Sequence, residues 1–237
     1  MSRRTAAACV FVVLLLAAFA TAGAAQAAGP VFFSKAPVGS TAPAVSFTDT
    51  WGAWFIEAQS GNKLSCNGAT GSGEVTGATT VANDHIALSG CETSGVECHN
   101  AAANEVVLNT LAGSLGSVSA TAPGLRLFSQ AEGKGGVLTE YTCAGGAVKV
   151  AWRGSVIGSL SGASGKTVEE GKLAGSIRET FSQSAGVQKY VRFLAGEGEA
   201  GEEQLEQNTG AGFEKLGISA IATIKTQPFS GELGFTK

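Results

Sequence analysis

The chain has little charge, little aspartate and few side chains suited to catalysis. Of its 237 residues 15% are charged, the only aspartates are Asp49 and Asp84, and there are two histidines. Calcium modules rely on clustered Asp and Asn oxygens, so two aspartates exclude that class. The net charge of −3 gives no electrostatic attraction for nucleic acid or an anionic membrane. The charged residues are also too sparse for a coiled coil or a charge-rich disordered chain.

The N-terminal residues have the pattern of an export signal. Arg3 and Arg4 precede an apolar stretch over residues 5–20, and the small residues Ala25 and Ala27 flank Gln26. This pattern predicts a signal peptide over residues 1–27, cleaved after Ala27. The apolar run is shorter than the roughly 20 residues of a membrane span, so we expect none after cleavage. The mature chain then carries 14 Lys and Arg against 19 Asp and Glu, a net charge of −5.

Four cysteines remain after the predicted cleavage: Cys66, Cys91, Cys98 and Cys143. An even number in an exported chain predicts two disulfides, and four cysteines allow three pairings. A short loop separates Cys91 from Cys98, so the sequence favours a Cys91–Cys98 pair and leaves Cys66 with Cys143. A metal site is the alternative, because His99 follows Cys98. No two ligands have the spacing of two to four residues that zinc sites favour, so we expect no metal and no cofactor.

Alternating apolar and polar residues indicate strands along most of the chain. Val148, Val150 and Trp152 alternate with Lys149 and Arg153. Similar runs occupy residues 54–58, 86–88, 106–108, 125–128, 137–143, 173–181, 187–193 and 216–224. No convincing helix is present. The pattern therefore predicts an all-β fold, an antiparallel β-sandwich or barrel of many short strands stapled by two disulfides.

The turn-forming residues suggest how the chain is divided. Residues 28–44 contain three prolines and predict an irregular N-terminal arm. Residues 45–237 are expected to form a single β domain, a usual size for such a fold. A Gly- and Ser-rich stretch over residues 161–171 is a weaker possible boundary within it.

Several short motifs built from small residues carry a family resemblance. They are Leu64-Ser65-Cys66, Gly73-Glu74-Val75-Thr76-Gly77, Ser89-Gly90-Cys91 with Cys98 close behind, Leu111-Ala112-Gly113-Ser114-Leu115-Gly116, Cys143, and Arg153-Gly154-Ser155-Val156-Ile157-Gly158. With these motifs, residues 64–224 resemble a group of exported, glycine-rich all-β proteins of actinobacteria that have no known activity. The resemblance implies a shared architecture and shared disulfides, and it implies no reaction.

Candidate functional residues are few, and each set needs a specific geometry. Trp51, Trp54 and Phe55 could form a sugar-stacking ligand surface, although strand positions three apart face opposite sides unless a turn intervenes. Hydrolysis of glycosides needs two carboxyl groups at a set separation. The candidates for that role are the strand residues Glu57, Glu140 and Glu179.

The sequence contains no coherent catalytic set. The chain has no G-x-S-x-G motif, and His85 and His99 are expected to be surface polar residues. We therefore expect a non-enzymatic structural or binding module that acts at or outside the cell envelope and has envelope or extracellular polysaccharide as a candidate partner. The alternative is an extracellular carbohydrate-active hydrolase that uses paired glutamates.

Overall fold

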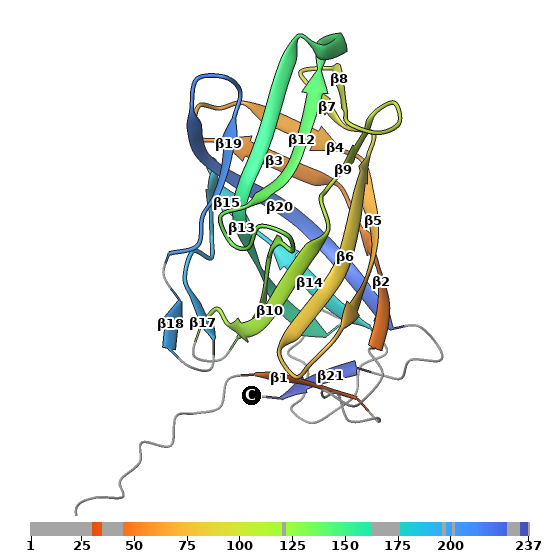
Figure 1. The fold of residues 1–237 in the computed structure, drawn as a ribbon, viewed down its shortest axis with the longest axis vertical. Coiled ribbons are helices and arrows are strands. Elements are labelled where there is room, and N and C mark those ends of the chain that lie inside the picture. Colours follow the sequence, from red (N-terminus) through yellow and green to blue (C-terminus); the bar gives the residue numbers. More distant parts are fainter. Residues whose placement is uncertain are drawn as a thin grey trace, which may run out of the picture.

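The computed structural model describes residues 30–34, 45–119, 122–162, 176–195, 198–200, 202–226 and 233–236. The predicted signal peptide lies outside these ranges, as do most of the 28–44 arm and residues 163–171 of the possible boundary. Within the arm, β1 (Val31–Ser34) forms a two-stranded sheet with β21 (Leu233–Thr236). Figure 1 shows this small sheet below the main body of the molecule.

The described residues form an all-β protein, as the sequence predicts. The exception is the short 3₁₀ helix η1 (Ala144–Gly146). No helix in the described part of the chain is long and apolar enough to span a membrane. The alternation expected over residues 86–88 is visible in burial, because Ile86 and Leu88 are buried while the flanking His85 and Ser89 are exposed.

The strand pairings close into two rings stacked end to end, so the fold is a barrel and not a sandwich (Figure 1). The lower ring consists, in order around the ring, of β2 (Val45–Trp51), β5 (Gly68–Val75), β6 (Thr80–Ser89), β10 (Leu111–Ser117), β11 (Pro123–Ser129), β13 (Val148–Gly162), β14 (Ile177–Phe181) and β20 (Phe213–Thr226). The upper ring consists of β3 (Trp54–Ala58), β4 (Lys63–Cys66), β7 (Glu92–Thr93), β8 (Val96–His99), β12 (Val137–Cys143), β13, β19 (Leu205–Asn208) and β20. All of these pairs are antiparallel.

Two long strands belong to both rings. The first half of β13 pairs with β12 and β19, and its second half pairs with β11 and β14. In the same way, β20 pairs first with β19 and β3 and then with β14 and β2. Gly154 lies where β13 changes partners, with a φ of 101° that favours glycine. The shared strands make one continuous structure from the two rings.

Short strands pack on the outside of the two rings. In the lower ring β17 (Phe193–Ala195) pairs with β10 and with β18 (Gly198–Ala200), and β9 (Glu105–Val107) pairs with β6. The pair β15 (Gln183–Ser184) and β16 (Val187–Gln188) lies against Gly217 of β20 and Ala58 of β3. Phe193 of β17 is fully buried against Arg126 of β11, with 4.8 Å from the guanidinium carbon to the ring centre. Glu203 accepts a hydrogen bond from Arg126 at 2.8 Å, and both side chains are buried. This cover explains why β11 is buried on both faces.

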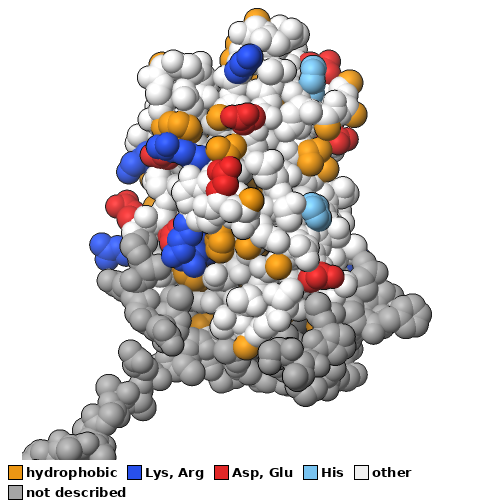
Figure 2. Space-filling view, in the orientation of Figure 1, with side chains coloured by type: hydrophobic (Ala, Val, Ile, Leu, Met, Phe, Trp, Pro, Cys, Tyr) orange, Lys and Arg blue, Asp and Glu red, His pale blue; other side chains and the backbone are white. Residues whose placement is uncertain are grey.

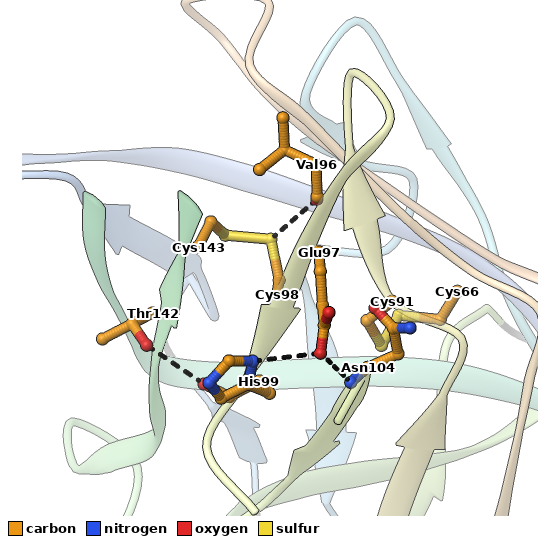
Figure 3. The surroundings of a disulfide bond; sticks show 9 residues. All are labelled: Cys66, Cys91, Val96, Glu97, Cys98, His99, Asn104, Thr142 and Cys143. Carbon is orange, nitrogen blue, oxygen red and sulfur yellow. Dashed lines mark hydrogen bonds and ion pairs between the residues drawn. A yellow bond between two sulfur atoms is a disulfide. The ribbon is translucent and has the colours of Figure 1, made fainter. Parts of the chain in front are cut away.

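The structure contains the two expected disulfides, but the predicted pairing is wrong. The bonds join Cys66 to Cys91 and Cys98 to Cys143, not Cys91 to Cys98 and Cys66 to Cys143 (Figure 3). One bond joins β4 to Cys91, the residue before β7, and the other joins β8 to β12, with Cα atoms 4.0 and 4.1 Å apart.

The hairpin register explains this correction. Cys91 and Cys98 are also opposite each other, but the Cys98 amide donates to the Cys91 carbonyl at 3.0 Å. Residues at such hydrogen-bonded positions have their Cα atoms farther apart than residues at the other cross-strand positions. A short loop between two cysteines therefore brings them close without making them the bonded pair.

Candidate functional site

The strongest candidate for a ligand site is the upper end of the molecule, where four turns surround the mouth of the upper ring. A cavity of about 340 Å³ opens there. Its walls combine amides, hydroxyls, one ammonium group and apolar side chains, from Asn62, Lys63, Leu64, Thr93, Tyr141, Cys143, Val148, Val150, Gln207 and Thr209. We call this space the mouth cavity. None of the described residues that line it is an Asp or a Glu.

A second, more open hollow adjoins the mouth cavity across β12 and β13. Its volume is about 890 Å³, and its polar lining includes His99, Asn100, Glu140, Thr142, Lys149 and Asn208. Tyr141, Val148, Val150 and Thr209 border both spaces. We call this hollow the outer groove. Together the two spaces form a continuous, mostly uncharged polar surface at the disulfide-bonded end.

Packing below the mouth holds Tyr141 in place. Its ring meets Trp152 edge-on, with ring centres 5.2 Å apart. Burial raises the pKa of Tyr141 well above its usual value, although the Trp152 side chain opposes that rise. The phenol therefore stays neutral across the physiological range and can act as a hydrogen-bond donor.

A hydrogen-bonded network fixes the rim of the mouth cavity on the β20 side. The Glu214 carboxylate accepts hydrogen bonds from the Ser60 amide and hydroxyl, each at 2.8 Å, and from Gln207 Nε2 at 3.2 Å. Burial alone would raise the pKa of Glu214, but these hydrogen bonds lower it. Glu214 thus remains ionised and ties the β3–β4 turn to β19.

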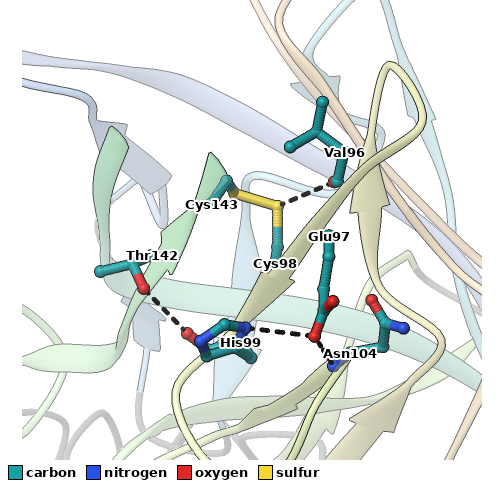
Figure 4. Close-up of polar contacts among 7 residues, drawn as sticks. All are labelled: Val96, Glu97, Cys98, His99, Asn104, Thr142 and Cys143. Atoms are coloured by element: carbon teal, nitrogen blue, oxygen red, sulfur yellow. Dashed lines mark hydrogen bonds and ion pairs between the residues drawn. A yellow bond between two sulfur atoms is a disulfide. The ribbon is translucent and has the colours of Figure 1, made fainter. Parts of the chain in front are cut away.

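A second network braces the side of the outer groove next to the Cys98–Cys143 disulfide (Figure 4). Glu97 Oε1 accepts a hydrogen bond from the Asn104 amide at 2.8 Å and lies 3.4 Å from His99 Nδ1. Thr142 donates to the His99 carbonyl at 3.4 Å. The histidine is thus a partly exposed polar residue in the groove wall.

The predicted aromatic ligand surface is not formed. Trp51 and Trp54 are buried, with exposed fractions of 4% and 2%, whereas Phe55 is exposed. Trp51 stacks on Phe181 with ring centres 5.3 Å apart, and it lies 5.0 Å from Trp54. The break at residues 52–53 turns the chain from β2 of the lower ring into β3 of the upper ring. Both indoles can therefore face the shared core although they are three positions apart.

The three glutamates considered for hydrolysis do not converge. Glu179 points into the lower ring, Glu140 is exposed on β12, and Glu57 is half-buried on the outer side of β3. Glu57 accepts a hydrogen bond from Gln183 and pairs with Lys63 at 3.4 Å. The carboxyl pair that a retaining or inverting glycosidase requires is therefore not built from these residues.

Sequence reasoning missed a set of buried carboxyl groups, Asp49, Asp84 and Glu179, inside the lower ring. A signal was present, because Asp49 lies on the apolar face of its strand between Phe47 and Trp51. The described residues contain no group of three His, Cys, Asp or Glu side chains that could hold a metal ion.

No family model matches the chain, and no curated protein and no solved structure matches it either.

Proposed function

We propose that this chain is an exported binding protein that acts at or outside the cell envelope and takes a neutral saccharide segment at the mouth cavity. The observation that carries the proposal is the lining of that cavity. It combines amide and hydroxyl groups with Leu64, Val148 and Val150, and no carboxylate is among its described lining residues. A sugar presents hydroxyl groups at its edges and C–H groups on its faces, so a lining of this kind complements it.

The outer groove extends the surface on which a chain of sugars could lie. Asn100 and Asn208 line this groove, and Glu140 and Lys149 add one negative and one positive side chain to its lining. Asn100 Nδ2 already donates to the Val107 and Glu140 carbonyls, so the wall that it forms is preorganised. A rigid wall lowers the entropic cost of binding, which suits a binding module.

Binding is tested by titrating the purified, oxidised protein with neutral glucan, galactan and arabinan oligosaccharides in a calorimeter. Thr209→Ala and Gln207→Met should each weaken binding by about 5- to 10-fold, because each removes one hydrogen-bonding group. Thr48→Ala is the matched control, since Thr48 is an exposed β2 residue of the lower ring. Unchanged affinity in both mouth variants, or no binding by any of the oligosaccharides, would contradict the proposal.

The same titrations distinguish binding from hydrolysis. Reducing ends are measured after long incubation with each oligosaccharide. Constant reducing ends together with binding support the binding module. A steady release that Glu140→Gln abolishes would establish the carbohydrate-active hydrolase instead.

Export is tested separately by mass spectrometry of the protein recovered outside the cell. The proposal expects a chain that begins at Ala28 and carries two disulfides. A chain that retains residues 1–27, or one that stays inside the cell, would contradict export.

A further inference from the structure

The interior of the lower ring contains three carboxyl groups from three different strands. Asp49 of β2, Asp84 of β6 and Glu179 of β14 have exposed fractions of 4%, 3% and 1%. Each lies on the inward face of its strand, among apolar side chains such as Phe47 and Ile86. One oxygen of each carboxyl group has no hydrogen-bond partner.

Glycines on neighbouring strands provide the space for two of these groups. A Cβ atom at Gly71, opposite Asp49, would collide with the Asp49 carboxyl group. A Cβ atom at Gly158 of β13 would lie 2.5 Å from Glu179 Oε1. The carboxyl groups thus fill positions that small residues leave open.

Among the described residues, no basic side chain faces these carboxyl groups from the strands packed around them. The nearest charged and titratable side chains on those strands are Glu74 of β5, His85 of β6, Arg126 of β11, Arg178 of β14 and Lys225 of β20. Each lies at an outward-facing position of its strand, and Arg126 is paired with Glu203 on the outside of the ring. The described parts of β10, and β13 from residue 155 onward, carry no charged residue.

Ionisation of the three groups is therefore unfavourable in the folded state. Burial raises the pKa of Asp49 to about 6. Burial also raises the pKa of Asp84 and of Glu179, and repulsion among the three carboxylates raises both further. A charge that is buried without a partner is costly, and like charges that share a site add to that cost.

We propose that these carboxyl groups make the stability of the lower ring depend on pH. The ring stays closed while they are protonated, and it opens more easily when they ionise. The direction follows from proton binding. The three groups bind protons more tightly in the folded ring than in the unfolded chain, so their contribution to stability is complete below about pH 4 and falls as the pH rises through 6 and above. This is opposite to the usual acid denaturation. The proposal does not depend on the saccharide site.

Hydrogen exchange between pH 4.5 and 8.5, corrected for the intrinsic pH dependence of exchange, tests the proposal on the unmodified protein. Amides of β2, β6 and β14 should open more easily as the pH rises. Asp49 alone, with its pKa raised from 3.8 to about 6, supports a change of about 30-fold in the opening equilibrium between pH 4.5 and 8.5. Amides of β8 and β12, beside the disulfide in the upper ring, are the internal control and should change less.

Two substitutions identify the groups responsible. Asp49→Asn and Glu179→Gln cannot ionise, so each should flatten the pH dependence of opening in the lower ring. Glu92→Gln removes an exposed carboxyl group of β7 and should leave the dependence unchanged. If either buried variant fails to fold, the exchange profile of the unmodified protein still decides. A lower ring that is equally protected at pH 4.5 and 8.5, or better protected at pH 8.5, would overturn the proposal.

Discussion

At the scale of single residues, the most consequential contacts are buried polar ones. Glu203 is the clearest case, because it accepts hydrogen bonds from Arg126 at 2.8 Å and from Ser155 at 2.5 Å, and it lies 3.6 Å from Lys134. These contacts attach the outer cover to β11 and β13. The carboxylate thus stabilises a surface that apolar packing alone would leave incomplete.

Replacing Glu203 with Gln should destabilise the protein by about 3 kcal/mol, because it leaves the Arg126 guanidinium buried without a counter-charge. The measurement is the urea midpoint of unfolding. Glu202→Gln is the matched control, since Glu202 is exposed and precedes Glu203 directly. Equal midpoints for the two variants would show that the ion pair contributes nothing to stability.

At the scale of elements, the disulfides join strands that are distant along the chain. Cys66–Cys91 spans 25 residues and Cys98–Cys143 spans 45. The second bond lies beside the Glu97, His99 and Thr142 contacts of the outer groove (Figure 4), and its Cys143 also lines the mouth cavity. The Cys98–Cys143 bond therefore contributes both to stability and to the shape of the candidate site.

Removal of either bond by paired Cys→Ser substitution should cost about 3.5 kcal/mol for Cys66–Cys91 and about 4 kcal/mol for Cys98–Cys143 in the chain-entropy model. Thermal unfolding of the two double variants measures the loss. Removal of Cys98–Cys143 should also weaken saccharide binding more than removal of Cys66–Cys91. Non-reducing peptide mapping provides the control, because the remaining bond in each variant should be the native one.

At the scale of the whole molecule, β13 and β20 couple the two rings. Neither ring can close without these strands, so loss of either strand would open both rings. The visible face is mainly uncharged, with scattered side chains of both signs and no dominant charged patch (Figure 2). The two rings are held together by the continuous strands β13 and β20 and by the shared core.

The shared strands lead us to expect a single calorimetric unfolding transition. Gly154→Ala should lower its midpoint without splitting it, because a Cβ atom at this positive-φ position would collide with the Gln204 carbonyl. Gly135→Ala is the control, since a Cβ atom there meets nothing within 4 Å. Two separated transitions in the unmodified protein would contradict coupling between the rings.

The sequence by itself determined the class of fold and the faces of the strands. Alternation such as that of Val150 and Trp152 with Lys149 and Arg153 is a local property, so it predicts which side chains face the core whatever the partner strands are; Val148 of the same face is exposed because it lies at the open end of the ring. The number of cysteines likewise predicted two disulfides. The position of Asp49 between Phe47 and Trp51 was a further local signal, but no buried carboxyl group was predicted from it.

Only the tertiary structure decided the pairings and the sites that depend on them. Closure into two rings, the Cys66–Cys91 and Cys98–Cys143 bonds, and the burial of Trp51 with Trp54 all depend on the register between strands far apart in the chain. The same is true of the cluster formed by Asp49, Asp84 and Glu179. A register shift of one residue would turn these side chains outward, and the energy that prevents it comes from packing across the whole ring. No short stretch of sequence contains that information.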